Sequence, residues 1–216
     1  MKKLLYKEMR LSANPLSYWF ITFSAMTMIP RYPILVGSFF ICLGIFYTYQ
    51  QVRECDDITY TVMLPVSKQD VVTAKYLFVL LIELVAFVLC ALLTIIRMKT
   101  LGNAAPYVTN QLMNANAAYL GYLLAVFASF NGIFLAGFFK TAYKLGKPFI
   151  LFCVVGTIII LMGEVLHHIP GLESLNDPAN LSIPQVVILL IGIVMFKLCT
   201  WFSYQKAIKD FERLDL

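Results

Sequence analysis

Apolar residues fall in six runs along the chain, and short polar stretches separate them. The runs cover residues 16–29, 34–50, 77–96, 117–139, 148–166 and 183–204. A helix that crosses a bilayer needs about 20 mostly apolar residues, so most runs have the length of a membrane span and the first is short. We therefore predict an all-α membrane protein of six transmembrane helices, in which residues 1–216 form a single transmembrane domain.

The segment before the first run, residues 1–14, has a different pattern. Its apolar and basic residues alternate at roughly helical spacing, as in Leu4, Leu5, Met9 and Leu11 against Lys2, Lys3, Lys7 and Arg10. This pattern is typical of a basic amphipathic helix that lies in the membrane interface. Asn14–Pro15 ends it and lets the chain turn into the membrane. A short solvated leader is the alternative.

The longest polar interval, residues 54–76, lies between the second and third runs. Ser67 and Asp70 fit a capping box, in which the serine accepts a hydrogen bond from a backbone amide and the acid reaches back. Pro65 stops a helix from continuing and favours an extended residue before it. We therefore predict a break at Leu64–Pro65 and a new helix that runs from Ser67 into the third span.

A second short helix is predicted before this break, because two acids precede spaced apolar residues there. The residues are Asp56, Asp57, Tyr60 and Met63. Two short helices that meet at a proline present Met63, Leu64 and Val66 to a partner. An ordinary solvated loop is the alternative, although a plain loop of this length rarely carries both a break and a cap.

The fourth run carries small residues at steps of three and four. They are Ala118, Gly121, Ala125, Ala128, Ser129, Gly132 and Ala136. Most of them share one helix face, where a second helix can approach closely. The stretch that precedes this run, residues 100–116, is polar, uncharged and rich in Asn. It predicts a loop, with room for a short interfacial helix.

Composition supports a membrane protein and excludes other classes. The chain is 60% hydrophobic and 13% charged, whereas a soluble domain is about half apolar and about a quarter charged. Its net charge of +5 is the excess expected of cytoplasmic loops rather than a sign of nucleic-acid binding. The five cysteines have neither metal-ligand spacing nor the pattern of a disulfide framework.

Basic residues decide the predicted orientation, because cytoplasmic loops are rich in Lys and Arg. Six spans place both termini on one side. With the termini in the cytoplasm, thirteen basic residues lie inside and three lie outside, with Lys197 within a span. The inner set is Lys2, Lys3, Lys7, Arg10, Arg53, Lys68, Lys75, Lys140, Lys144, Lys147, Lys206, Lys209 and Arg213, and the outer set is Arg31, Arg97 and Lys99.

Catalytic and metal-binding motifs are absent from the sequence. No phosphate-binding G-x-x-x-x-G-K-[ST] occurs, and Gly146–Lys147 is followed by proline. No H-E-x-x-H, C-x-x-C or G-x-S-x-G occurs either. His167 and His168 are adjacent and point in different directions on a regular element, so we assign them to interfacial solvation. We expect no catalytic residue and no metal site.

Charged residues inside the spans are costly and often functional. Glu83 and Lys197 lie at similar depth near the cytoplasmic ends of the third and sixth spans, which suggests an ion pair between them. Glu164 and Arg97 suggest a second pair near the outer ends of the fifth and third spans. The alternative is that Lys197 reaches to the interface and that the glutamates are protonated or face water.

The run TVMLPVSKQDVVTAKYL, residues 61–77, resembles the LPVS-x-x-x-[IV]-V-x-x-KY signature of type-2 ABC exporter permeases. The architecture is similar too, with a basic elbow helix, six spans and the signature between the second and third. By size and by the LPVSK form, the chain is most similar to permeases of small bacterial peptide exporters. Exporters of phenol-soluble modulins and lantibiotic immunity transporters are examples.

The resemblance implies two permease subunits, which are identical or paralogous, bound to two cytoplasmic ATPase subunits. ATP and Mg²⁺ bind to the ATPase, and this chain holds no cofactor. The stretch between the second and third spans is the coupling helix of such permeases. Carried onto this chain, that role falls to Met63, Leu64, Pro65, Val66, Ser67, Lys68, Gln69 and Asp70.

The resemblance further implies that the first, second and fifth spans line the dimer interface and the transport route. Candidates for the route are Trp19, Phe20, Phe23, Met26, Phe39 and Phe40, which suit an amphipathic ligand but equally suit contact with lipid. We expect export of a small amphipathic peptide or similar hydrophobic substrate across the cell membrane. A membrane-embedded enzyme of lipid or protein processing and a non-transporting scaffold are the alternatives. The sequence leaves open the substrate, and whether the chain serves toxin export, self-immunity or drug resistance.

Overall fold

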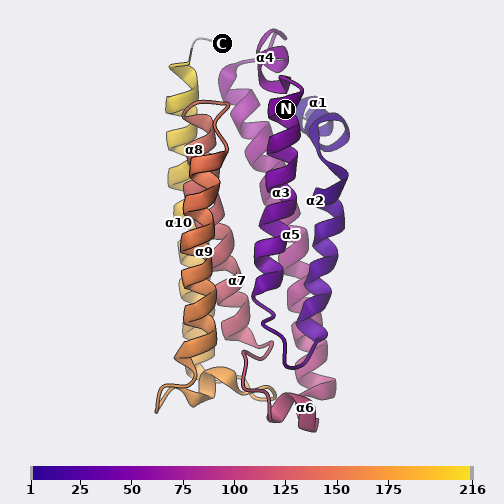
Figure 1. Ribbon diagram of the computed structural model, residues 1–216, viewed down its shortest axis with the longest axis vertical. Helices are drawn as coiled ribbons and strands as arrows, with labels where there is room; N and C mark the ends of the chain where they lie inside the picture. The colour runs from indigo at the N-terminus through magenta and orange to yellow at the C-terminus, as the bar shows by residue number, and fades with distance from the viewer. Residues whose placement is uncertain (1, 215–216) are drawn as a thin grey trace.

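The computed structural model describes residues 2–214, so Met1 of the predicted elbow and residues 215–216 of the tail lie outside the described part. Helices make up the structure, and the described residues form no strand. Six helical rods run along the long axis (Figure 1). They are α2 with η2 (Pro15–Trp19, Phe20–Met28), α3 (Val36–Glu54), α5 (Lys68–Leu101), α7 with η3 and α8 (Ala117–Ser129, Phe130–Leu135, Ala136–Phe139), α9 (Gly146–Leu166) and α10 (Ile183–Glu212).

The shorter elements cover the two ends of the bundle (Figure 1). The upper end in that view holds α1 (Lys2–Lys7), η1 (Glu8–Ser12), α4 (Asp57–Val62) and the end of α10. The lower end holds α6 (Ala105–Val108) and η4 (Glu173–Asn176). Helix α1 and the end of α10 therefore lie at the same end of the bundle (Figure 1).

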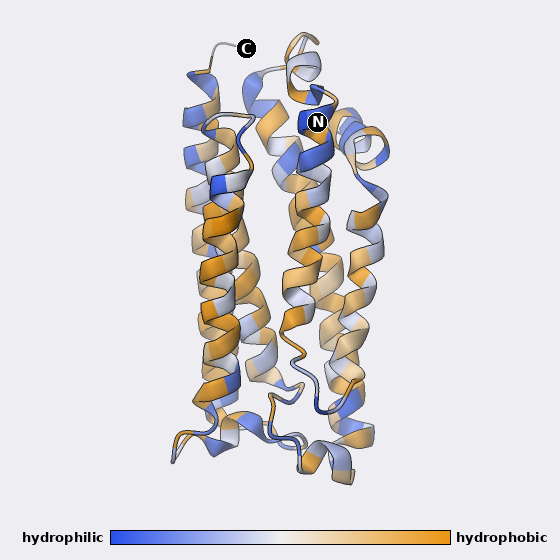
Figure 2. Cartoon of the chain, viewed as in Figure 1, coloured by the Kyte–Doolittle hydropathy of each residue, from blue (hydrophilic) through white to orange (hydrophobic). Residues whose placement is uncertain are grey.

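Hydropathy follows this layout, since apolar residues fill the middle of the rods and polar residues gather at both ends (Figure 2). The helices α5, α9, α10 and the rod that begins with α7 are long and apolar enough to cross a membrane. The other two rods, over residues 15–28 and 36–54, are the remaining spans of the six-span prediction. Whether they cross a bilayer stays a prediction.

The first rod reaches farther than its residue count suggests, because η2 is a 3₁₀ helix of 9 residues. A 3₁₀ helix rises about 2.0 Å per residue, against about 1.5 Å in an α-helix. Nine residues therefore extend about 18 Å instead of about 13 Å. The short apolar run gains length in this way, which the sequence pattern did not reveal.

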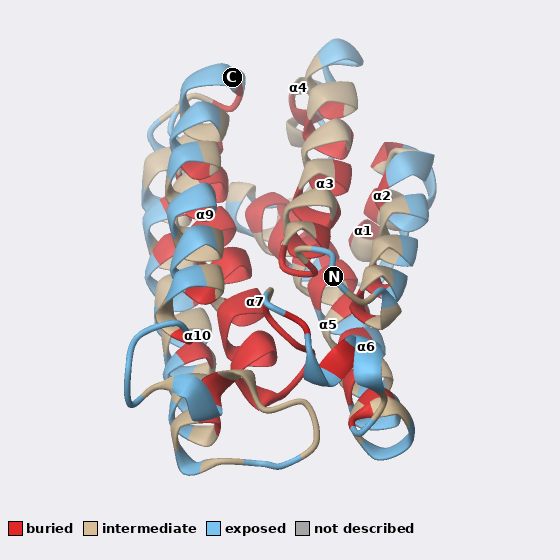
Figure 3. Ribbon diagram, turned by 60° about the horizontal axis from the view of Figure 1, so that its bottom comes forward, coloured by how far each residue is buried: buried red, intermediate tan, exposed pale blue. Residues whose placement is uncertain are grey.

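The rod that begins with α7 is the centre of the bundle (Figure 3). Of its most apolar stretch, 83% is buried, against 17% for α10. Gly121 of α7 faces α10 so closely that an added Cβ would lie 2.5 Å from the carbonyl oxygen of Ile188. Gly192 of α10 meets the Gly121 backbone in the same crossing. This confirms the predicted close approach of a second helix at Gly121 of the small-residue face.

Asparagine side chains order the loops at the lower end. Asn116 caps α7, since its Oδ1 accepts from the Tyr119 amide at 3.1 Å. The Asn114 amide donates to Asn176 Oδ1 at 2.7 Å, which joins the loop before α7 to η4. The short helix expected within residues 100–116 is α6.

Candidate functional site

The predicted break and helix start between the second and third long apolar helices are confirmed. Helix α4 ends at Val62, a turn follows, and Ser67 caps α5 by accepting from the Asp70 amide at 3.1 Å. The Ser67 hydroxyl also donates to Asp70 Oδ2 at 2.7 Å, so the acid reaches the serine side chain instead of its backbone amide. We call residues 63–70 the 63–70 segment.

The 63–70 segment forms a tip at the upper end of the bundle with an apolar surface. Met63 is 79% exposed, and Leu64 is also exposed. Tyr60, on the preceding helix α4, adds a third exposed apolar side chain beside them. Val66 is only half-exposed and packs against the core, so it does not contribute to the tip as predicted.

An ion cluster of Lys7, Glu8, Asp57 and Lys75 lies directly behind this tip. Lys75 Nζ lies 2.8 Å from Glu8 Oε2 and 3.0 Å from Asp57 Oδ2. Lys7 Nζ lies 3.2 Å from Glu8 Oε1 and also pairs with Asp57 Oδ1. Two cations therefore alternate with two carboxylates, and the cluster is neutral as a whole.

The ion cluster joins three segments that are far apart in the sequence, namely α1 with η1, α4 and α5. Glu8 and Lys75 are buried, with 2% of each side chain exposed, so each depends on its partners for stability. Lys7 also donates to Thr61 of α4 at 2.8 Å. These contacts hold α4, and with it the 63–70 segment, against the start of α5.

Electrostatics within the cluster favour the ionised form of Asp57. Burial by itself raises the pKa of this carboxyl, but the charges and hydrogen bonds of Lys75 and Lys7 outweigh burial and lower it from its ordinary value. Asp57 is therefore a carboxylate that holds both lysines, and each lysine stabilises its ionised form.

Sequence reasoning missed this cluster. It assigned Lys7 and Lys75 to positive inner loops and gave Glu8 no role. The buried face of the first helices is Leu4, Glu8 and Ser12, whereas an apolar face was expected. A signal was present, because Glu8 is the one acid among the basic residues of the predicted elbow, and an acid at a buried helical position needs a cation.

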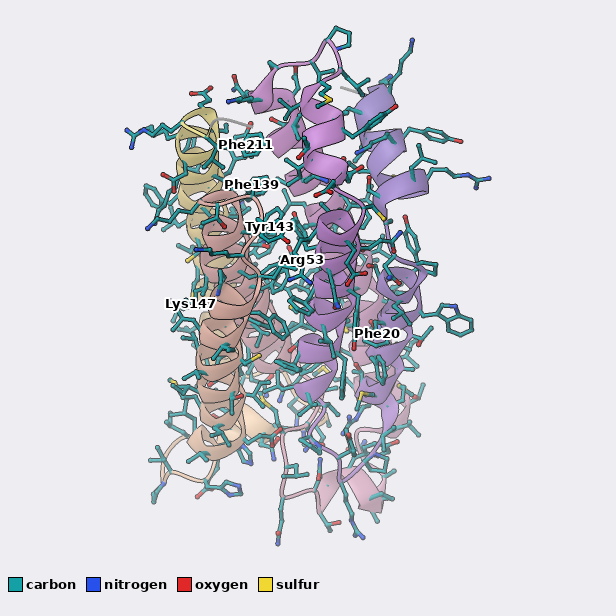
Figure 4. All side chains as sticks on the ribbon, turned by 45° about the horizontal axis from the view of Figure 1, so that its top comes forward. Phe20, Arg53, Phe139, Tyr143, Lys147 and Phe211 are labelled. Atoms are coloured by element: carbon teal, nitrogen blue, oxygen red, sulfur yellow. The ribbon has the colours of Figure 1, made fainter. Side chains whose placement is uncertain are left out.

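A second contact at the upper end connects the loop after α8 to α3. The Arg53 guanidinium lies over the Tyr143 ring, 5.9 Å from its centroid (Figure 4). A cation above an aromatic face is attracted by the ring quadrupole. Phe139 of α8 and Phe211 of α10 meet edge to face nearby, with centroids 5.7 Å apart (Figure 4). The ends of α3, α8 and α10 are thereby held together.

A buried polar network lies deeper in the bundle, between α5, η3 and α10. Asn131 Nδ2 donates to Glu83 Oε2 at 2.9 Å and to Thr200 Oγ1 at 3.1 Å. The Ser203 hydroxyl donates to the Asn131 carbonyl and lies 2.6 Å from the Tyr76 hydroxyl. Asn131 sits in the π-helix η3, whose wider turn interrupts the regular helix at this point.

The structure does not bring the two predicted ion pairs together. Among residues 2–214, no ion pair includes Glu83, Lys197, Arg97 or Glu164. Glu83 has the amide of Asn131 as its partner instead, and Lys197 is exposed on the outside of α10.

Arg97 and Glu164 each hold the loop between α6 and α7. Arg97 donates to Asn114 Oδ1 at 2.8 Å and to the Thr27 carbonyl, while Glu164 Oε2 accepts from the Met113 amide at 2.8 Å. Uncharged partners replace the predicted pair, because the Asn-rich loop lies within reach of both side chains.

The sequence of the chain also matches a known protein family. A family model described as ABC-2 family transporter protein matches residues 3–212, which is nearly the whole chain. The chain belongs to this family. The ABC-2 chain is therefore a multi-pass membrane permease of an ABC transporter, in a family that generally works with an ATPase subunit. No curated protein and no solved structure matches it significantly.

The six route candidates of this ABC-2 permease lie on neighbouring rods. Phe23 stacks on Phe40 with centroids 4.6 Å apart, and Phe39 stacks on Phe152 of α9 with centroids 5.7 Å apart. Phe20 meets Phe23 edge to face. The candidates that are half-buried along this face are Phe20, Phe23, Met26, Phe39 and Phe40, whereas Trp19 is 70% exposed.

The two adjacent histidines lie at the lower end of this ABC-2 permease. Residues 2–214 contain no group of three or more His, Cys, Asp or Glu side chains that could hold a metal ion. The rings of His167 and His168 lie 4.1 Å apart, and His167 Nε2 is 3.0 Å from the Gln111 carbonyl oxygen. These histidines therefore belong to the ordered loops of the lower end.

Proposed function

We propose that the chain is the permease subunit of an ATP-driven exporter and that the 63–70 segment docks on a cytoplasmic ATPase. The observation that carries this proposal is the exposed Met63 on a tip whose base is fixed by the ion cluster. Methionine is enriched at protein interfaces, where it adapts to the partner surface. The upper end is then the cytoplasmic side, in agreement with the positive-inside rule.

The ion cluster connects the docked segment mechanically to the long helix α5. Force applied to the tip passes through Asp57 to Lys75, about two turns into α5. Because Ser67, within the 63–70 segment, caps α5, the segment continues directly into this helix without a flexible linker. ATP and Mg²⁺ bound by two ATPase subunits would thus tilt α5 and drive alternating access.

The apolar face of α9 supports pairing with a second permease, identical or paralogous. Only 22% of its most apolar stretch is buried within the chain, although the helix is long enough to span the membrane. The aromatic residues of η2 and α3 continue this face through the Phe39–Phe152 stack. We place the permease interface and the transport route there.

We further propose that the substrate is a small amphipathic peptide and that it leaves the cytoplasm. The half-buried aromatic rings of the route candidates offer stacking surface to apolar side chains without demanding one sequence. ATP-dependent uptake of such a peptide into inside-out vesicles would support this, and uptake that needs no ATP or ATPase subunit would contradict it.

Co-purification tests the docking claim. Met63→Asp places a charge in the proposed contact, so we expect the amount of ATPase that co-purifies with the tagged permease to fall about tenfold, which corresponds to about 1.4 kcal/mol. Leu181→Asp is the matched control, because Leu181 is 65% exposed at the opposite end. Equal ATPase recovery with both variants would exclude the 63–70 segment as the docking site.

A further inference from the structure

A groove runs along the outside of the bundle between α5 and α10. It consists of an upper cavity of ≈ 570 Å³ and a lower one of ≈ 360 Å³, which share Leu80, Phe196 and Lys197 in their walls. These volumes fall in the range of small-molecule sites, about 300–1,000 Å³. Tyr76, Thr200 and Glu83 of the buried polar network form part of its inner wall.

The walls of the groove are apolar along its whole length, and a few polar side chains stand at its upper rim. Thr73 and Tyr204 lie at the upper end, where their hydroxyls are 2.9 Å apart, and Trp201 stands beside them. Tyr and Trp mark the level of lipid headgroups in membrane proteins. The lower cavity instead ends among apolar side chains such as Leu84 and Phe87.

Lys197 is the cation of the groove. It lines both cavities and is exposed, and no ion pair among residues 2–214 includes it. It lies one helical turn, about 6 Å, below Trp201, so its side chain can extend along the groove toward the headgroup level. A lysine ammonium among apolar walls is costly without a counter-charge.

The nearest acid of the groove does not supply that counter-charge. Glu83 also lines the lower cavity, but it is buried and its Oε2 is engaged by Asn131. The groove thus has an unpaired cation below an aromatic belt and an apolar pocket beneath it. An anionic headgroup on an acyl chain matches this order of groups.

We propose that the groove binds one anionic phospholipid of the surrounding leaflet. Its phosphate lies at Lys197, near the hydroxyls of Thr73 and Tyr204, and one acyl chain fills the lower cavity beside Leu84. The lipid would bridge α5 and α10. At the upper end, α5 begins in the 63–70 segment and α10 ends at Glu212. This site does not depend on the identity of the exported substrate.

Native mass spectrometry of the delipidated full-length permease tests the proposal by titration with dioleoylphosphatidylglycerol and dioleoylphosphatidylcholine. We expect Lys197→Met to weaken phosphatidylglycerol binding about fivefold, the factor expected for one lysine near a membrane surface, and to leave phosphatidylcholine binding unchanged. Lys197→Arg should retain the preference. Lys147→Met, at an exposed lysine outside the groove, is the control and should change nothing.

A second variant tests the acyl-chain pocket independently of charge. Leu84→Trp fills the lower cavity and should weaken the binding of both lipids. Equal phosphatidylglycerol affinity of the wild type and Lys197→Met would overturn the proposal. A loss of permease pairing in Lys197→Met with unchanged lipid affinity would also overturn it, because the groove would then be a protein interface.

Discussion

At the scale of single residues, the upper end of the bundle is held by buried ion pairs between residues that are far apart in the sequence. Lys75 reads as one more cytoplasmic lysine, yet it is buried between Glu8 and Asp57. Its partners come from segments 67 and 18 residues away in the sequence, so no local pattern could have predicted the contact. The fold brings these residues together, and their ion pairs then stabilise the packing of α1, η1 and α4 against α5.

Removing one charge from the cluster should therefore destabilise the protein. In Lys75→Met, two carboxylates remain near a single lysine in a buried site, so we expect a loss of about 3–5 kcal/mol in the free energy of unfolding. Chemical unfolding in detergent would measure it. Lys144→Met, at an exposed lysine, is the control, and an equal effect of both variants would contradict a structural role for the cluster.

Glu83 poses a different problem, because its Oε1 and the Asn131 Oδ1 are both buried acceptors without a partner among the described residues. A proton on Glu83 would let Oε1 donate to such an acceptor, and a glutamine amide would do the same. Glu83→Gln should therefore unfold at nearly the wild-type temperature. Glu83→Leu should cost about 1–3 kcal/mol, since Asn131 loses a partner. Equal destabilisation of the two variants would contradict a neutral Glu83.

At the scale of elements, the sequence predicted what local chemistry decides. The cap at Ser67, the break at Pro65 and the small-residue face that includes Gly121 each depend on a few neighbouring residues, and the structure has all three. The 3₁₀ helix η2 and the π-helices η1 and η3 were not predicted. The backbone by itself favours the α-helix over 3₁₀ and π helices. We therefore attribute these irregular turns to packing against the neighbouring rods, which the sequence pattern does not encode locally.

The crossing of α7 and α10 gives the sharpest test of packing. Gly121→Ala places a Cβ against the backbone of Ile188, and we expect this overpacking to cost about 1–3 kcal/mol or more in the free energy of unfolding. In Gly132→Ala the new Cβ lies 3.8 Å from Cys199 Cβ, an ordinary contact. That variant should be neutral or stabilising, because alanine favours a helix over glycine. The reverse order of stability would contradict the close approach.

At the scale of the whole molecule, α5 connects the two ends of the bundle. Its 34 residues extend about 51 Å, from the 63–70 segment to Leu101, and Arg97 in its last part holds η2 and the loop before α7. One continuous helix thus links the 63–70 segment to the lower end, and in the proposed coupling mechanism it transmits the movement of the tip. An ABC-2 permease needs such a connection, since the energy enters outside the membrane and the substrate crosses it.

The docking of the 63–70 segment on the ATPase is the central claim, and site-specific photo-crosslinking tests it most directly. A benzoylphenylalanine placed at Met63 should yield an adduct with the mass of the permease plus the ATPase. The same group at Ile169, an exposed apolar position at the lower end, should yield none. Absence of the ATPase adduct at position 63, in a complex that still contains the ATPase, would contradict the account.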